Sequence, residues 1–207
     1  MEILHSESYT CTASERRAAR DAGAAGAAPA DALADLTNVA FITHCYVKEH
    51  DTLFAGRSDG LVAMWHLSGP GVGHEAKDFV LGSHSGPVHG LCFHEDMGGK
   101  GLLFTGAVDR AIRVWDPWVR DLKDACIQTI VGHGGTINAL CCGPGCVISA
   151  SNDGTLRVWR PDPTRSLLMY PWLVCTQVIT DGPAWVTSCA IRSGDIVSLY
   201  VGDASGT

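Results

Sequence analysis

Three segments of the chain align with one another without gaps, and each runs from an aspartate to a tryptophan six residues later. The three pairs are Asp59 and Trp65, Asp109 and Trp115, and Asp153 and Trp159. The tryptophans are 50 and 44 residues apart, which indicates repeating units of about 40–50 residues. A unit of this size cannot bury an apolar face alone, so the repeat predicts a series of similar units stacked on one another.

Each repeat has the pattern of four short strands. In the second repeat the apolar run 102–104 precedes a turn at Asp109, after which apolar and polar residues alternate up to Trp115. A further apolar run lies upstream at 88–93 and another downstream at 127–131. We therefore expect an all-β fold, in which each repeat forms a small sheet of four antiparallel strands.

The repeats also predict how the chain is divided. Residues 1–35 contain eleven alanines with interspersed glycine and proline, and we expect a flexible leader there. The four repeats that follow are assigned to residues 36–81, 82–131, 132–180 and 181–207. The last one stops inside its hairpin, so we expect about 3.5 units, either in a truncated chain or in one completed by further units from another chain.

Two of the repeats open and close in the same way: Gly82-Ser83-His84 with Trp115-Asp116, and Gly132-His133 with Trp159-Arg160. This pattern resembles the WD-repeat family, the β-propellers related to the G-protein β subunit. The resemblance covers about residues 36–207 and implies β-propeller blades, here in an incomplete propeller. The first repeat is degenerate, because Asn38 stands at the histidine position and Ala55 at the hydroxyl position.

The resemblance implies a structural tetrad in each of two repeats, in which aspartate, histidine, a hydroxyl group and the tryptophan N–H are hydrogen-bonded. The tetrads are His84, Thr105, Asp109 and Trp115, and His133, Ser149, Asp153 and Trp159. A Ser-His-Asp hydrolase is the alternative, but a catalytic triad occurs once per active site and needs an oxyanion hole. Repetition therefore favours a structural role, and the first repeat keeps only Asp59 and Trp65.

These features predict a non-catalytic scaffold for protein–protein interaction, as a component of a larger multiprotein assembly. By family resemblance, residues beside the turn aspartate lie near the commonly used face, and the candidate partner-binding residues there are Arg57, Ser58, Val108 and Asn152. Trp118 and Trp172 neighbour prolines and are candidates either for packing or for anchoring a partner. A cytoskeletal or axonemal structural protein and a propeller enzyme are the alternatives; no convergent acids, histidines or metal ligands support the enzyme.

Charge and composition argue against other classes. The chain has 15 Lys and Arg against 22 Asp and Glu, and it has no basic cluster, so we expect neither nucleic acid nor a membrane as partner. No apolar stretch approaches the roughly 20 residues that span a bilayer. Nine scattered cysteines without a secretory signal predict a reducing compartment, the cytoplasm, with the cytoskeleton or cilium as the other location considered. No cofactor is expected.

Two further groups of residues, the cysteines near residue 145 and an insertion in the second repeat, each allow two interpretations. Cys141, Cys142 and Cys146 either pack in the core or contribute to a metal or redox site. Adjacent strand residues point to opposite faces, so only two of the three can converge readily, which favours packing and no metal. The insertion 94–101, which contains His94-Glu95-Asp96, is either a solvated loop or a recognition element, because insertions in repeats often mark a binding face.

Overall fold

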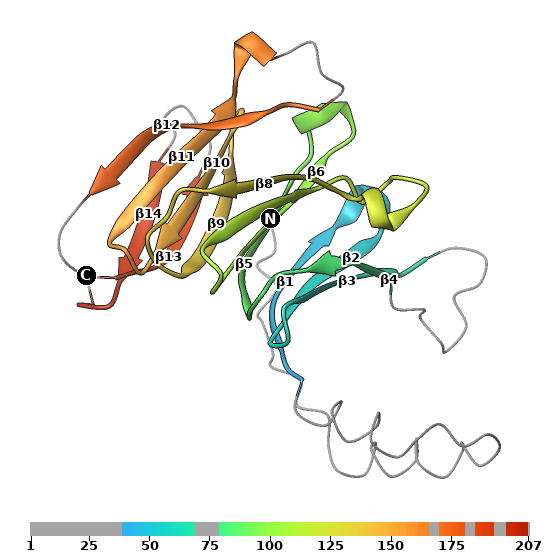
Figure 1. Ribbon diagram of the computed structural model, residues 1–207, viewed down its shortest axis with the longest axis horizontal. Helices are drawn as coiled ribbons and strands as arrows, with labels where there is room; N and C mark the ends of the chain where they lie inside the picture. The colour runs from blue at the N-terminus through green and yellow to red at the C-terminus, as the bar shows by residue number, and fades with distance from the viewer. Residues whose placement is uncertain (1–38, 69–78, 166–169, 181–184, 193–197, 207) are drawn as a thin grey trace. The chain divides into compact units, whose positions relative to one another are not determined.

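The computed structural model describes residues 39–68, 79–165, 170–180, 185–192 and 198–206 (Figure 1). These residues form three four-stranded antiparallel sheets and one two-stranded sheet, and they contain no α-helix. The predicted all-β class, with about 3.5 propeller blades, is confirmed. The predicted leader, residues 1–35, lies outside the described residues.

The strands follow the chain order, sheet by sheet. The first sheet contains β1 (Phe41–Val47), β2 (Thr52–Arg57), β3 (Leu61–His66) and β4 (Phe79–Ser83). The second contains β5 (Val88–His94), β6 (Leu102–Ala107), β7 (Ala111–Trp115) and β8 (Cys126–Val131). The third contains β9 (Ile137–Gly143), β10 (Cys146–Ser151), β11 (Thr155–Pro161) and β12 (Leu173–Thr180). The fourth contains β13 (Val186–Arg192) and β14 (Ser198–Asp203). Short 3-10 helices lie between strands: η2 (Lys48–His50), η3 (Met97–Gly99), η4 (Leu122–Asp124) and η5 (Pro163–Arg165).

The turn between the second and third strands has the same backbone conformation in three sheets. The residue after the turn aspartate has a positive φ of 89° at Gly60, 67° at Arg110 and 76° at Gly154. Glycine adopts this left-handed region without steric strain, whereas a residue with a Cβ atom does so at a cost. The Asp-Gly pairs therefore suit the turn, and Arg110 is held there by the strands that it joins.

The first strand of each sheet contacts the first strand of the next. β5 lies between β1 and β9, and β9 lies between β5 and β13, so the four sheets stack in chain order (Figure 1). Consecutive sheets do not share a ladder of backbone hydrogen bonds. The contacts between them are therefore made by side chains.

Apolar side chains from neighbouring sheets form three buried clusters. One cluster joins the first and second sheets through Phe54, Val62, Val88, Leu103 and Trp115. The next joins the second and third sheets through Phe104, Ile112, Ile137, Val147 and Trp159. The last joins the third and fourth sheets through Ile148, Leu156, Val158 and Val186. The second and third sheets therefore bury side chains on both faces, as a stacked repeat requires, whereas the first sheet contributes to one cluster.

Close approach of the sheets leaves no room for a side chain at Gly56 on β2. A Cβ atom added there would lie 2.6 Å from Cγ1 of Val88, the first residue of the next sheet. A larger residue at Gly56 would require the two sheets to move apart.

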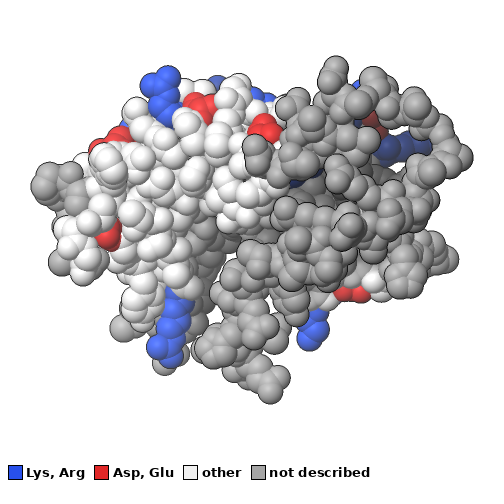
Figure 2. Space-filling view, turned by 90° about the horizontal axis from the view of Figure 1, so that it is seen from below, with Lys and Arg blue, Asp and Glu red and all other residues white. Residues whose placement is uncertain are grey.

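No helix among the described residues is long and apolar enough to cross a membrane. On the face shown in Figure 2, the charged side chains of the described residues are scattered and form no continuous patch of one sign.

Candidate interaction surfaces and the hydrogen-bonded tetrads

The second sheet brings its four predicted tetrad residues together. Nδ1 of His84 lies 3.0 Å from each carboxylate oxygen of Asp109, and Nε2 lies 2.7 Å from the hydroxyl of Thr105. The same hydroxyl accepts a hydrogen bond from the indole N–H of Trp115, at 2.8 Å. The carboxylate of Asp109 also accepts from the backbone N–H of Ser85, at 3.0 Å. These bonds link the segment that enters the sheet to the β6–β7 turn and to β7.

The third sheet repeats the arrangement. Nδ1 of His133 lies 2.9 Å from Asp153 Oδ2, and Nε2 lies 2.6 Å from the hydroxyl of Ser149. The indole N–H of Trp159 donates to that hydroxyl at 2.8 Å. The hydroxyl of Thr155 adds a bond to Asp153 Oδ1 at 2.6 Å, which the second sheet lacks because Ala111 stands there.

Burial sets the protonation of the tetrads. It lowers the pKa of His84 and His133 below the ordinary value of 6.5, and the raising effect of the neighbouring carboxylates is smaller. For Asp153, burial raises the pKa, but hydrogen bonds from Thr155, Gly134 and His133 together outweigh it, so the pKa lies below its usual range. Each tetrad is thus a carboxylate with a neutral imidazole, in which Nε2 accepts a hydrogen bond from the hydroxyl group.

The two hydroxyl groups are not placed to act as nucleophiles. Thr105 and Ser149 are completely buried, and each hydroxyl oxygen already contacts an imidazole and an indole N–H. A substrate carbonyl could reach neither oxygen without displacing the tryptophan. The geometry therefore supports the structural role that the family resemblance implies.

Each tetrad tryptophan also packs against the preceding sheet. The ring of Trp159 covers Gly132, where an added Cβ atom would lie 2.9 Å from Cη2 of the indole. Trp115 covers Gly82 at the end of β4 in the same way. The glycine of the opening motif thus gives the indole room between two sheets.

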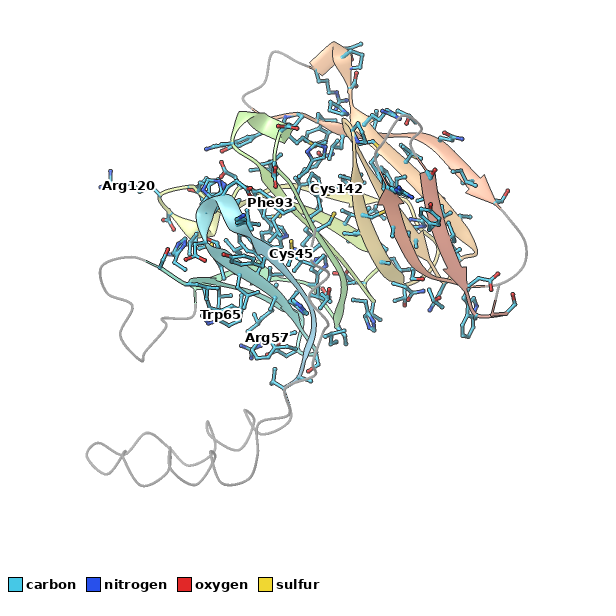
Figure 3. All side chains as sticks on the ribbon, turned by 180° about the vertical axis from the view of Figure 1, so that it is seen from behind. Cys45, Arg57, Trp65, Phe93, Arg120 and Cys142 are labelled. Atoms are coloured by element: carbon cyan, nitrogen blue, oxygen red, sulfur yellow. The ribbon has the colours of Figure 1, made fainter. Side chains whose placement is uncertain are left out.

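The first sheet holds its turn differently. Ala55 is buried and offers no hydroxyl group, and Asn38 lies outside the described residues. Asp59 accepts hydrogen bonds from the backbone N–H of Leu61, at 3.1 Å, and from the guanidinium of Arg57, at 2.6 Å. Trp65 packs edge-on against Phe41, with the ring centroids 5.6 Å apart; Figure 3 shows Trp65 and Arg57 on this sheet.

The candidate partner-binding residues fall into two groups at opposite ends of the sheets. Because the strands are antiparallel, the turns after the second strand of each sheet share one end, which we call the turn end. The connections after the first and third strands share the other end, which we call the connection end. Arg57, Ser58, Val108 and Asn152 are at the turn end, and Trp118 and Trp172 are at the connection end.

At the turn end, three of the four candidates also contact their own chain. The hydroxyl of Ser58 accepts from the Ala40 N–H at 2.9 Å, and the Asn152 side-chain oxygen accepts from Asn138 at 2.6 Å. Arg57 pairs with Asp59, as described above. Val108 is 41% exposed and presents an apolar side chain to solvent.

At the connection end, the two tryptophans differ. Trp118 is half-buried among Phe54, Phe93 and His50, and its indole N–H donates to the Lys100 carbonyl at 3.0 Å. Trp172 is 37% exposed, with the guanidinium of Arg165 over its ring at 5.1 Å. Trp118 therefore packs between the first two sheets with part of its side chain still exposed, and Trp172 is more accessible.

Sequence reasoning missed a buried carboxylate at the connection end. Asp116, which follows the tetrad tryptophan, is completely buried and accepts from the Tyr170 hydroxyl at 2.6 Å and from the backbone N–H of Trp118 at 2.9 Å. The ammonium group of Lys100 lies 2.7 Å from its Oδ2. Asp116 thus ties the insertion of the second repeat to the third repeat. The sequence did contain a signal for this site, the Trp115-Asp116 pair. The third repeat has Arg160 after its tryptophan, so a carboxylate at this position distinguishes the second repeat from the third.

The expectation of a solvated loop is wrong for part of the insertion: Met97 is 5% exposed and belongs to the cluster between the second and third sheets, and His94 is buried as well. His94 ends β5, is 9% exposed, and donates from Nε2 to the carbonyl of Gly143 on β9 at 3.0 Å. Glu95 and Asp96 are exposed. His94 is buried because β5 continues one residue further than the apolar pattern indicates, which brings the imidazole against the third sheet.

The cysteines divide between two faces. Cys142 packs between the second and third sheets, where its thiol donates to Cys92 Sγ at 2.9 Å, and Cys141 packs on the opposite face with Cys146 and Cys189. Burial, with the neighbouring Cys142, raises the pKa of the Cys92 thiol. Figure 3 shows Cys45 and Cys142 along the stacked inner strands. Within the described ranges, no group of three or more Cys, His, Asp or Glu is placed to hold a metal ion.

Comparisons with known proteins agree with this architecture. The family model described as "WD domain, G-beta repeat" matches residues 77–116 and 124–160. These matches contain both tetrad tryptophans and both turn aspartates.

Curated relatives match over part of their length. The chain is 30% identical over 113 residues to a ribosome biogenesis protein WDR12 homolog of Chlamydomonas reinhardtii, covering 53% of this chain and 24% of the relative. It is 28% identical over 157 residues to transducin beta-like protein 3 of Mus musculus, covering 73% and 18%. It is 24% identical over 164 residues to the nuclear distribution protein PAC1 of Komagataella phaffii, covering 72% and 32%. The chain thus spans less than a third of the length of each of these relatives.

Solved structures give the fold alone. The computationally designed Ika4 protein superposes with a TM-score of 0.57 at 22% identity, over 81% of this chain and 88% of Ika4. The designed Ika8 protein superposes with a TM-score of 0.56 at 22% identity, over 81% of this chain and 44% of Ika8. The match to the family model, together with the repeated tetrads and the stacked four-stranded sheets, shows that residues 77–116 and 124–160 are WD repeats.

Proposed function

We propose that the chain is a non-catalytic scaffold that binds other proteins and works as a component of a larger multiprotein assembly. The observation that carries this proposal is the turn end, where short turns from three consecutive sheets share one side of a stacked array. Short segments held by a rigid scaffold are well suited to contact a partner without a large loss of conformational entropy. The names of two relatives, which refer to ribosome biogenesis and nuclear distribution, are compatible with such a role.

The tetrads support binding rather than catalysis. They fix the β6–β7 and β10–β11 turns through bonds to buried histidines, so Val108 and Asn152 lie beside turns of fixed geometry. Because both tetrad hydroxyls are buried and hydrogen-bonded, we assign no catalytic residue.

Site-specific photo-crosslinking tests the proposal. Replacing Val108 by benzoylphenylalanine places the probe at the turn end, and the same replacement of Val178, 48% exposed on the outer strand β12, is the matched control. We expect a discrete cross-linked protein in cell extract from position 108 and not from position 178. Alanine at Arg57, Ser58 and Asn152 should then weaken that cross-link. A cross-link of equal yield from both positions, or none from position 108, contradicts the assignment of the turn end.

A further inference from the structure

A shallow pocket of about 460 Å³ lies at the connection end, between the first and second sheets. Three segments that are distant in sequence form it: η2, the end of β5 with the following insertion, and the β7–β8 connection. The side chains that line it are Glu49, His50, Phe93, Glu95, Lys100 and Trp118. The insertion of the second repeat therefore contributes to a concave surface.

The pocket has a fixed aromatic wall. The ring of Trp118 lies 4.2 Å from that of His50 and 6.3 Å from that of Phe93, measured between centroids. The bond from its indole N–H to the Lys100 carbonyl prevents the ring from turning. An indole that is already packed and hydrogen-bonded loses little conformational entropy when a ligand stacks on it.

The pocket also carries uncompensated negative charge. Glu49 and Glu95 are exposed, and neither carboxylate has a hydrogen bond or ion pair among the described residues. Lys100 does not neutralise them, because its ammonium group is paired with the buried carboxylate of Asp116 at 2.7 Å. Arg120, from the same connection as Trp118, projects outward into solvent (Figure 3).

We propose that this pocket binds an arginine side chain of a partner protein, with the guanidinium group against the Trp118 ring and paired with Glu49 and Glu95. A guanidinium stacks on an indole face and donates in a fixed plane to carboxylates, so both features of the pocket complement it. The inference rests on the proposed scaffold function and adds a second binding surface at the opposite end from the turn-end residues.

Nuclear magnetic resonance of the full chain tests this directly, at low salt. The probe is the capped tripeptide acetyl-Gly-Arg-Gly-amide, and the control peptide carries citrulline, which has a similar shape without the charge. We expect the Trp118 indole N–H resonance to shift saturably with the arginine peptide. We also expect about ten-fold weaker binding of the citrulline peptide, because the cation–π contact and both ion pairs are lost.

Variants separate the pocket from other acidic sites. Glu49→Gln combined with Glu95→Gln should remove the preference for arginine, whereas Asp96→Asn, a neighbouring exposed carboxylate that does not line the pocket, should retain it. Equal shifts with both peptides, no saturable shift, or an undiminished preference in the double variant would overturn the inference. The photo-crosslink at position 108 reports on the other end of the sheets, so it distinguishes failure of this pocket from failure of the scaffold function.

Discussion

The first and third sheets have the same strand order but hold their turns by different means. In the third sheet, Asp153 accepts from His133, Thr155 and Gly134, whereas in the first sheet Asp59 accepts from Leu61 and the partly exposed Arg57. The β2–β3 ladder nevertheless forms over its full register. The tetrad is therefore not required for strand pairing; it adds a buried link between the turn and the segment that enters the sheet.

The largest expected effect on stability is the loss of the turn aspartate from the third sheet, compared with the same loss from the first sheet. Asp153→Ala leaves the buried imidazole of His133 without its acceptor and removes the bonds from Thr155 and Gly134, which should lower the free energy of unfolding by about 3 kcal/mol. Asp59→Ala removes a surface ion pair and a turn bond, and we expect a loss below about 1 kcal/mol. Urea denaturation of both variants measures the difference. Equal losses would mean that the tetrad adds no stability beyond the turn itself.

A smaller loss should follow from crowding the tetrad tryptophan. Gly132→Ala places a methyl group against the Trp159 ring, and overpacking of this kind destabilises by about 2 kcal/mol. Gly134→Ala is the matched control, because an added Cβ atom there would lie 3.7 Å from its nearest neighbour. Thermal melts of the two variants should separate clearly. A Gly132→Ala variant as stable as its control would show that the indole can shift without loss.

The tetrads also predict a pH dependence. Because burial lowers the pKa of His84 and His133, the unfolded chain binds more protons than the folded chain at pH values below about 6.5. The contribution of the tetrads to the free energy of unfolding should be fully present above about pH 6.5. At lower pH it should decrease by up to about 1.4 kcal/mol per pH unit for each histidine. Replacing His133 by Asn, the residue at this position in the first repeat, should reduce the slope of the melting temperature between pH 6.5 and 5. An unchanged slope would mean that His133 does not contribute to it.

The smallest effect concerns the backbone of the turns. Arg110 adopts the conformation that the first and third sheets give to glycine, with a φ of 67°. Arg110→Gly should therefore stabilise the protein by about 0.5–1 kcal/mol, since it removes the steric strain of a Cβ atom. The reverse change, Gly154→Arg, should destabilise it by a similar amount. Chemical denaturation checks both, and a loss of stability in Arg110→Gly would show that the arginine side chain makes a compensating contact.

Local sequence pattern was sufficient for the strands and the turns, and the family resemblance supplied the membership of the tetrads. The hydroxyl residue, the aspartate and the tryptophan keep a constant spacing in the two repeats, whereas the histidine lies 25 residues before the aspartate in one and 20 in the other. The opposite orientation of Cys141 and Cys142 follows equally from strand alternation.

Contacts between sheets could not be predicted in this way. His94 bonds to Gly143, and the side chain of Gln128 pairs with the backbone of Leu173, 45 residues away. Alternation along a strand indicates which face a side chain occupies, but not which residue of the next sheet stands opposite. For the same reason the packing of Trp118 had no local signal. The partner-binding residues and the cytoplasmic location stay predictions.

The close approach of Gly56 to Val88 has a consequence for how such a chain can diverge. Gly56 belongs to the first repeat and Val88 to the second, so the space available to one repeat is set by a side chain of another. A duplicated repeat could not accumulate substitutions at this position alone; a larger residue at 56 would need a smaller one at 88, and also at Thr43 of its own sheet, whose Cγ2 would lie 2.9 Å from the added Cβ atom. Natural variation at these two positions should therefore be correlated, and repeats exchanged between related chains should be compatible only when both members of such a pair are transferred together.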